Sequence, residues 1–161
     1  MGVLVEAFFD GVCEPVNPGG TAAYGILVKV DGKPIHSDGH LVVKGPEASN
    51  NVAEYAGFCA AVDWILNQNL LGVTIIRGDS KLVIMQLQNL WKVNGGRYLP
   101  YYYKAKHLLA ILRERTENNV SLEWIPRDMN SECDTYSKDV LRRMGIKLRI
   151  QPDVVSRKKE D

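Results

Sequence analysis

The order in which strand-like and helix-like patterns follow one another constrains this chain of 161 residues more than any other feature. Three short apolar runs come first, and Asp31-Gly32 marks a hairpin between the second and the third. Helical periodicity then alternates with two further strand-like runs. This order predicts an antiparallel meander of three strands, to which right-handed crossovers add two strands parallel to the first. The predicted strands cover residues 3–9 and 23–30, a third segment that follows Asp31-Gly32 and runs through about 41–43, and residues 73–76 and 120–125.

Helices are predicted in the segments that separate and follow the later strands. The first, from Asn50 to about Asn69, is apolar over a wide arc, which indicates that it packs on two sides. A second, from about Ser80, should turn Val83, Leu87 and Leu90 inward. The fold class is therefore α/β, with a five-stranded mixed sheet and helices on both faces. The remaining helices are predicted over residues 100–117 and 130–144.

Length and composition indicate one folded domain. A hydrophobic content of 45% and a charged content of 24% are those of an ordinary globular protein. We predict a single domain over residues 1–150 and a polar, flexible tail over residues 151–161. The net charge is +1, whereas a protein that binds nucleic acid by electrostatics alone is strongly basic.

The termini and the cysteines indicate a cellular compartment. The first residues lack the charged region of a signal peptide, and no apolar run approaches the ~20 residues of a membrane helix. The cysteines are odd in number and have no CxxC spacing. We therefore expect a cytoplasmic protein with no membrane partner, in which Cys13, Cys59 and Cys133 are free thiols.

Four acidic residues stand where distant segments could form a single site. Asp10 and Asp79 follow two neighbouring parallel strands, and Glu54 and Asp134 lie one turn into two helices. Ligands of such sheets bind beyond the carboxyl ends of the parallel strands. Carboxylates gathered in a cleft repel one another unless cations neutralise them. Because all the ligand atoms are oxygens, the pattern favours Mg²⁺ or Mn²⁺ over zinc.

The same acids also have local explanations. The spacings from Asn51 to Glu54 and from Ser131 to Asp134 match a capping box, and an acidic first turn favours the helix dipole. Asp79 could cap the helix that follows it. Only convergence of all four carboxylates separates a metal site from these explanations.

Four motifs along residues 3–145 resemble the type 1 ribonuclease H family, in the form found in archaeal and some bacterial members. The resemblance implies a ribonuclease H-like fold. Its motifs are Asp10-Gly11 followed by Asn17-Pro18-Gly19-Gly20, Ser49-Asn50-Asn51 with Glu54, Gly78-Asp79-Ser80, and Trp124-Ile125-Pro126-Arg127 with Asn130 and Asp134.

The resemblance implies an endonuclease that hydrolyses the RNA strand of RNA–DNA hybrids and leaves 5′-phosphate products. It implies two Mg²⁺ ions per site, with Mn²⁺ as a possible substitute, that clamp the attacking water and the leaving oxygen. The hybrid would be the partner; we expect a monomer with no small-molecule cofactor. The implied catalytic and metal-ligating residues are Asp10, Glu54, Asp79 and Asp134. The implied substrate-binding residues are Asn17, Ser49, Asn50, Asn51, Ser80 and Arg127.

The chain departs from the family's bacterial archetype in two places. A loop histidine before the last carboxylate is missing, and Arg127 is its candidate substitute. Arginine cannot lose its charge, so it could assist electrostatically but not as a base. The segment between Trp91 and Pro100 has no room for a basic helical protrusion. Nearby cations and tyrosines could replace it, although the tyrosines could equally be packing residues: Lys92, Arg97, Lys104, Lys106, Tyr98 and Tyr101 to Tyr103.

Two other functions remain open at this point. The first is a nuclease of the same fold with another substrate, such as a transposase or integrase core or a Holliday-junction resolvase. The second is a non-catalytic module that binds nucleic acid. The brevity of the chain and its asparagine-rich helix start argue against the first, and the intact set of four acids argues against the second.

Overall fold

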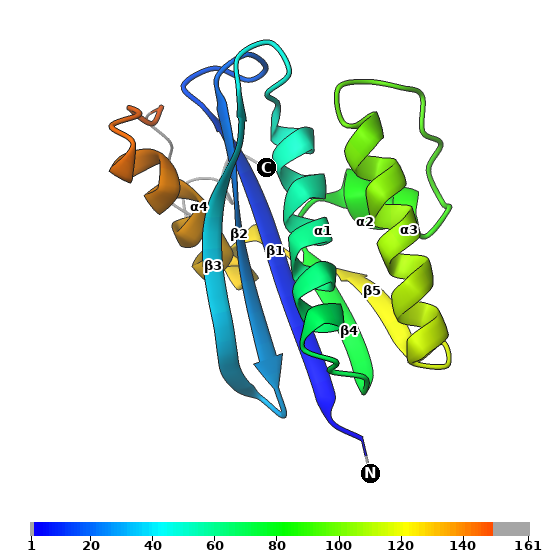
Figure 1. Cartoon of the computed structure of the whole chain (residues 1–161). Coiled ribbons are helices and arrows are strands. Elements are labelled where there is room, and N and C mark those ends of the chain that lie inside the picture. Colours follow the sequence, from blue (N-terminus) through cyan, green and yellow to red (C-terminus); the bar gives the residue numbers. More distant parts are fainter. Residues whose placement is uncertain (1, 150–161) are drawn as a thin grey trace.

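The computed structural model describes residues 2–149 and contains one five-stranded sheet with the order β3-β2-β1-β4-β5 (Figure 1). The β1–β2 and β2–β3 pairs are antiparallel, and the β1–β4 and β4–β5 pairs are parallel. The predicted mixed sheet is therefore confirmed, whereas the predicted tail at 151–161 lies outside the described residues. The strands are β1 (Leu4–Glu14), β2 (Thr21–Val30), β3 (Lys33–Lys44), β4 (Val73–Gly78) and β5 (Val120–Trp124).

Helices cover both faces of the sheet, as predicted. Figure 1 shows α1, α2 and α3 on one face and α4 on the other. None of the helices between residues 2 and 149 has the length and apolar character required to cross a lipid bilayer. The helices are α1 (Asn50–Asn67), α2 (Lys81–Leu87), α3 (Leu99–Arg115) and α4 (Ser131–Arg143), with a short 3-10 turn, η1 (Arg127–Met129).

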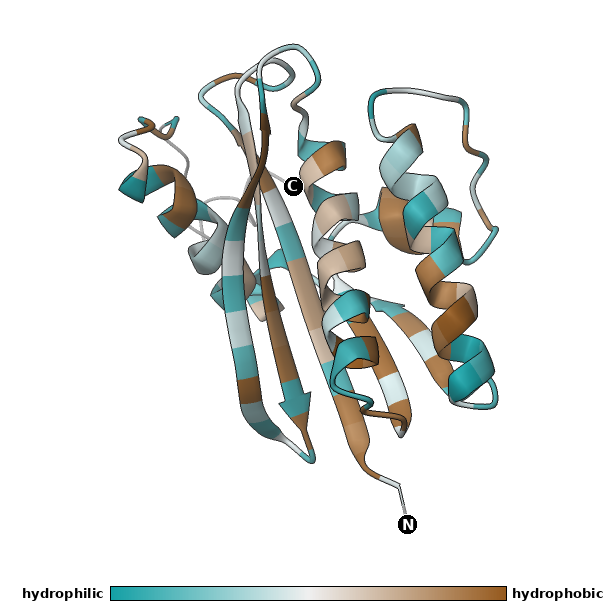
Figure 2. Cartoon of the chain, viewed as in Figure 1, coloured by the Kyte–Doolittle hydropathy of each residue, from teal (hydrophilic) through white to brown (hydrophobic). Residues whose placement is uncertain are grey.

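The main core lies between the sheet and α1. Alternate residues of β1, namely Val5, Ala7 and Phe9, are fully buried on this face, and Phe58 of α1 meets the Phe9 ring edge-on at 5.6 Å. Helix α1 also packs against α3, which explains why its apolar arc is so wide. Figure 2 shows hydrophobic residues dominating β1 and β4, whereas hydrophilic residues interrupt the edge strand β3.

Strand β1 is longer than predicted, and this changes the setting of Asp10. The sequence suggested that the strand stops in a turn at Asp10-Gly11, but β1 continues to Glu14 because β2 keeps pairing with it. The parallel partner β4 stops pairing at Phe9, opposite Gly78. Asp10 therefore lies on a continuous strand at the point where its parallel neighbour turns away.

Most of the tyrosines between residues 98 and 103 act as packing residues against the main core, whereas Tyr103 is 64% exposed. Tyr55 is fully buried, Tyr98 stacks on it at 5.4 Å and Tyr102 meets it edge-on at 5.8 Å. The Tyr55 hydroxyl donates to Gln86 Oε1 at 2.6 Å. The packing interpretation thus holds for these residues. Leu90 was predicted to point inward but is 66% exposed, because α2 ends at Leu87.

The three cysteines are free, as predicted, and all three are buried. A cytoplasmic location stays a prediction.

Candidate active site

Glycine at position 11 brings two acidic side chains together. The Gly11 amide donates to Asp10 Oδ1 at 2.9 Å and to Glu54 Oε1 at 2.8 Å. A Cβ atom at Gly11 would lie 2.4 Å from the backbone nitrogen of Glu54, so only glycine lets β1 approach α1 this closely. Both carboxylates are buried, with exposed fractions of 5% for Asp10 and 3% for Glu54. One backbone N–H thus fixes the relative position of two acids that are far apart in the sequence.

Asp79 is held by the end of β5. The Trp124 indole donates to the backbone oxygen of Asp79 at 3.1 Å, and the Ile125 amide donates to the Gly78 oxygen at 3.0 Å. The next residue, Ser80, is the N-cap of α2, and its hydroxyl accepts from the Val83 amide at 3.3 Å. The interpretation of Asp79 as the helix cap is therefore wrong, because Ser80 caps α2. The Asp79 carboxylate is not used for capping and can take part in the acidic cluster.

Asp134 reaches the cleft from the opposite face of the sheet, on α4. Gly25 permits this approach, because a Cβ atom there would lie 2.3 Å from the Cys133 carbonyl oxygen. Asn130 anchors the start of α4 by donating from its side chain to the Phe9 carbonyl at 2.8 Å. Lys138, one turn further along α4, donates to Asp134 Oδ2 at 2.9 Å. Asp134 is therefore both positioned and partly neutralised by its own helix.

Neither predicted capping box forms. Ser49 is the N-cap of α1 and its hydroxyl accepts from the Val52 amide at 3.1 Å, so Glu54 lies beyond the capping positions. Asn130 is the N-cap of α4 and makes no side-chain cap bond, and Asp134 bonds to Lys138 instead. The capping-box explanation therefore fails for both acids, although Asp134 does lie in the first turn of α4, where its charge favours the helix dipole. Neither local effect accounts for the convergence of the acids.

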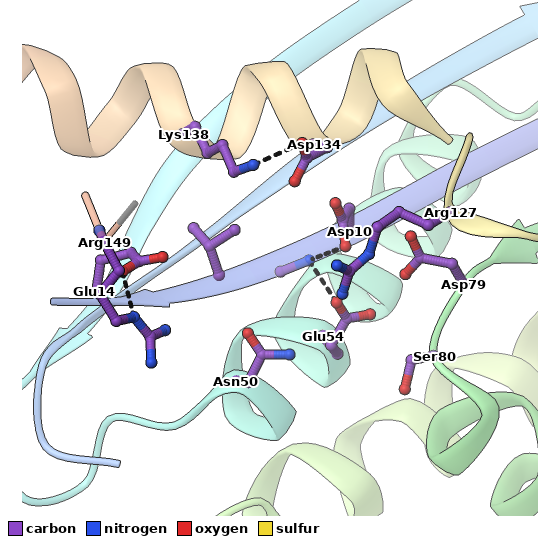
Figure 3. A pocket seen from close by; sticks show the side chains of 12 residues that line it. Asp10, Glu14, Asn50, Glu54, Asp79, Ser80, Arg127, Asp134, Lys138 and Arg149 are labelled. Carbon is purple, nitrogen blue, oxygen red and sulfur yellow. Dashed lines mark hydrogen bonds and ion pairs between the residues drawn. The ribbon is translucent and has the colours of Figure 1, made fainter. Parts of the chain in front are cut away.

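Three of the acids form a compact cluster, and the fourth lines the same cleft (Figure 3). One carboxylate oxygen from each of Asp10, Glu54 and Asp79 lies within 4.8 Å of the other two. The cleft has a volume of about 130 Å³. It is lined by Asp10, Gly11, Val12, Glu14, Asn50, Glu54, Asp79, Ser80, Arg127, Asp134, Lys138 and Arg149.

Burial and mutual repulsion keep protons on this cluster when no cation is bound. Burial, followed by the charges of Glu54 and Asp79, raises the pKa of Asp10 well above its ordinary value. Burial raises the pKa of Glu54 to about 8. Burial also raises the pKa of Asp79, although the positive charge of Arg127 opposes that shift. The site is thus a place where negative charge is unfavourable unless a cation compensates for it.

The donor set fits a hard divalent cation. Glu54 Oε2 and Asp79 Oδ2 are buried and make no hydrogen bond within residues 2–149. Buried acceptors without a donor are costly, so they indicate a missing partner. Because all the candidate ligand atoms are carboxylate oxygens, a cation such as Mg²⁺ matches them better than zinc does.

The raised pKa values predict that the metal-free protein loses stability as the pH rises. The pKa of Glu54 rises from its ordinary value of 4.5 to about 8 in the folded protein. Between pH 4.5 and pH 8 the unfolded chain has therefore released a proton that the folded chain retains. The free energy of unfolding should therefore fall by a few kcal/mol from pH 4.5 to pH 8 and then level off. Urea denaturation in EDTA across this range measures it.

Glu54→Gln should flatten this pH dependence, because the glutamine side chain does not titrate. Glu47→Gln, at an exposed position before α1, is the matched control and should leave it unchanged. If wild type and Glu54→Gln show the same pH dependence, the raised pKa of Glu54 is wrong.

The predicted substrate-binding residues divide into two groups. Asn50, Ser80 and Arg127 line the cleft. Asn17, Ser49 and Asn51 are not among the residues that line it, although Ser49 and Asn51 adjoin Asn50 in the chain. The Asn17 side chain accepts from the Asn50 amide at 2.9 Å, which ties the β1–β2 loop to the N-terminus of α1. The side chains of Asn17 and Asn51 are exposed, and we call Asn17, Ser49, Asn50 and Asn51 the polar rim.

Five lining residues were not predicted as parts of the site, and three of them are charged: Glu14, Lys138 and Arg149. Lys138 had a signal in the sequence, since it follows Asp134 by four residues on the same helix. Glu14 and Arg149 are 135 residues apart and bond to each other, and no spacing rule links residues so far apart.

Known proteins share similarity with most of this chain. A family described as "Reverse transcriptase-like" matches residues 8–140. Ribonuclease HI of Halobacterium salinarum is 30% identical over 140 residues, which cover 87% of this chain and 65% of that protein. A bifunctional protein of Mycobacterium tuberculosis is 32% identical over 142 residues, which cover 88% of this chain and 36% of that protein. The chain therefore spans less than two thirds of either relative.

Solved structures agree with these matches. The crystal structure of RNase H1 from Halobacterium salinarum has a TM-score of 0.74 at 28% identity and covers 87% of this chain and 98% of that chain. The N-terminal RNase H domain of the mycobacterial protein has a TM-score of 0.75 at 27% identity and covers 88% of this chain and 96% of that chain. LC11-RNase H1, solved in complex with an RNA/DNA hybrid, shares the fold with a TM-score of 0.72 at 24% identity, over 87% of this chain and 98% of that chain.

Proposed function

Because the chain belongs to the type 1 ribonuclease H family, we propose that it is a metal-dependent endonuclease that hydrolyses the RNA strand of RNA–DNA hybrids and leaves 5′-phosphate products. One observation carries this proposal: oxygens of Asp10, Glu54 and Asp79, from three separate segments, lie within 4.8 Å of one another. Two of these acids also have a buried oxygen that finds no donor among residues 2–149. Cation binding explains both features.

The four acids would hold two Mg²⁺ ions, with Mn²⁺ as a substitute. Bound cations of this kind supply a reactive water at neutral pH and compensate the charge of the scissile phosphate. Asp10 is central, because the charges of both Glu54 and Asp79 act on its carboxylate. The Gly11 N–H fixes the carboxylates of Asp10 and Glu54 next to each other, because it donates to both. Lys138 orients Asp134 by donating to its carboxylate. These contacts would preorganise the ligands before any cation or substrate arrives.

Arg127 would act by charge and not by proton transfer. It lines the cleft, and its positive charge lowers the pKa of both Asp79 and Glu54. A guanidinium keeps its proton, so Arg127 cannot be the base that a loop histidine could provide. We assign it to limiting the upward pKa shift of these acids and to contacting a backbone phosphate.

Recognition of the hybrid would use the polar rim. Asn50 and Ser80 line the cleft, the Asn17 side chain bonds to Asn50, and Ser49 and Asn51 adjoin Asn50 in the chain. Amides and hydroxyls of this kind can contact 2′-hydroxyls, base edges and phosphates in the wide minor groove of an A-like duplex. The net charge of +1 does not argue against this substrate, because two bound Mg²⁺ ions would offset the four acids of the site.

The alternatives are weaker on the same evidence. A non-catalytic module would have no reason to keep buried acids whose pKa values are raised by burial and repulsion. A nuclease of the same fold with another substrate would keep the acids, so substrate selection separates it from a ribonuclease H. A monomeric state and a single domain over residues 1–150 stay predictions.

Substrate selection tests the proposal directly. The purified chain with Mg²⁺ is given end-labelled RNA–DNA hybrid, duplex DNA and double-stranded RNA of one sequence. We expect cleavage of the RNA strand of the hybrid, an intact DNA strand, at least about 100-fold slower cleavage of duplex DNA and no reaction in EDTA. Cleavage of duplex DNA as fast as the hybrid would favour the alternative nuclease, and no cleavage of any substrate by folded protein would favour the module.

A further inference from the structure

The cleft extends along β1 beyond the acidic cluster. Asp10, Val12 and Glu14 alternate along the strand and share one face, and four residues of strand place Glu14 about 13 Å from Asp10. Val12, between them, packs against α4. Figure 3 shows Glu14 and Arg149 at one end of the cleft and Asp79 and Arg127 toward the other. The cleft therefore has a second end, which the proposed metal site does not use.

A buried carboxylate fixes an arginine at this second end. Arg149 Nε donates to Glu14 Oε1 at 2.7 Å, and the Arg149 amide donates to the same oxygen at 3.1 Å. Arg149 Nη2 donates to the Cys13 carbonyl at 2.9 Å. The Glu14 side chain is 2% exposed and the Arg149 side chain is 47% exposed. The anion thus lies inside the protein, and the outer part of the guanidinium faces the solvent of the cleft.

The geometry points to Arg149 as a binding residue for a backbone phosphate of the hybrid, with Glu14 as the residue that positions its guanidinium. This inference rests on the proposed function. A buried ion pair alone is a weak source of stability, whereas a guanidinium held in one orientation suits bidentate contact with phosphate. Glu14 and the Cys13 carbonyl use two of the five N–H groups, so donors remain for a phosphate.

The other cations of the cleft serve the acidic cluster. Lys138 bonds to Asp134, and the charge of Arg127 acts on Glu54 and Asp79. Arg149 is the lining cation set apart from that cluster, because it bonds to Glu14 at the other end of the cleft. A strand whose scissile phosphate lies at Asp10 and whose backbone follows β1 would bring a later phosphate to Arg149. The residue would therefore add to binding and register, and not to the chemical step.

A matched pair of double variants tests this inference. Glu14→Gln with Arg149→Gln removes the pair without leaving a buried unpaired carboxylate. Asp139→Asn with Arg142→Gln removes another arginine–carboxylate pair, which is exposed on α4 and bonded at 2.8 Å. Both changes leave the net charge unaltered. Fluorescence anisotropy with labelled hybrid, in an Asp10→Asn background that should prevent cleavage, gives the dissociation constant as a function of salt.

We expect the Glu14–Arg149 double variant to bind the hybrid about 5- to 30-fold more weakly at about 0.1 M salt and to lose roughly one unit of the slope of log K against log salt. The Asp139–Arg142 variant should stay within about twofold of the parent. Arg149→Lys, which keeps the charge but not the fork, should give an intermediate affinity.

Equal affinity and equal slope in the two double variants would overturn the role of Arg149. The thermal midpoint of each variant verifies that it is folded. If the Glu14–Arg149 double variant unfolds, Arg149→Lys is the variant that is measured. An affinity of Arg149→Lys equal to that of the parent would then overturn the phosphate-binding role of Arg149. If the Asp10→Asn parent does not bind the hybrid, the proposed function is overturned instead. This result is distinct from a loss of affinity in the double variants, because each of them is compared with that parent.

Discussion

Asp10→Asn should abolish cleavage of the hybrid, with a loss of about 10³-fold or more in turnover, while the protein stays folded. Asparagine has the size of aspartate, so the packing beside Gly11 can persist. Its amide cannot supply the ionised oxygen that a bridging cation needs. Because Asp10 lies between the charges of Glu54 and Asp79, the loss should exceed that at any other single acid of the site.

The same variant should be more stable than wild type when no metal is present. Burial and two neighbouring carboxylates disfavour the charged form of Asp10, and the amide removes that cost. A gain on the order of 1–2 kcal/mol would raise the melting temperature in EDTA by roughly 2–8 °C for a domain of this size. Added Mg²⁺ should stabilise wild type but not the variant.

Asp139→Asn is the control for both measurements. Asp139 does not line the acidic cleft and is half-exposed and paired with Arg142, so its loss should leave activity and melting temperature nearly unchanged. An Asp10→Asn protein that keeps more than about a tenth of wild-type turnover would show that the acidic cluster does not hold the reactive cations as proposed.

Gly11→Ala should disrupt the site and the fold together. A Cβ atom at this position would lie 2.4 Å from the Glu54 nitrogen and 2.5 Å from the Ala53 carbonyl carbon. Both are backbone atoms of α1, which cannot swing aside as a side chain can. We expect about 3 kcal/mol of destabilisation, a melting temperature lowered by roughly 6–12 °C, and at least about 100-fold slower cleavage as Glu54 moves away from Asp10.

Gly2→Ala is the matched control, because a Cβ atom there would meet only the Gly72 Cα at 3.9 Å, an ordinary contact. Thermal denaturation and hybrid cleavage should be near wild type for this variant. A Gly11→Ala protein with wild-type stability would mean that β1 and α1 are further apart than described.

The sequence predicted the parts of the site that depend on where elements end. Asp10 and Asp79 could be placed together because parallel strands present their carboxyl ends at one edge. Glu54 could be placed near them because a helix start follows the meander. Its capping role was wrong, because α1 begins earlier than the Asn51–Glu54 spacing assumes: Ser49 is the N-cap and accepts from the Val52 amide.

The sequence could not predict features that depend on contacts between distant segments. The extent of β1 past Asp10 depends on continued pairing with β2, which a turn-like Asp-Gly pair hides. The bond between Glu14 and Arg149 joins residues 135 positions apart, and their types alone suggest surface charges. Only the fold shows that one of them is buried and that the other lines the cleft.

Anomalous scattering from Mn²⁺ soaked into crystals of the wild-type protein tests the central claim most directly. We predict a strong peak about 2.0–2.3 Å from oxygens of Asp10 and of Glu54 or Asp79, and a second peak on the side of Asp134. Both peaks should be absent in Asp10→Asn crystals soaked in the same way. Ordered carboxylates at Asp10, Glu54 and Asp79 with no peak between them would contradict a metal-dependent nuclease site in this cleft.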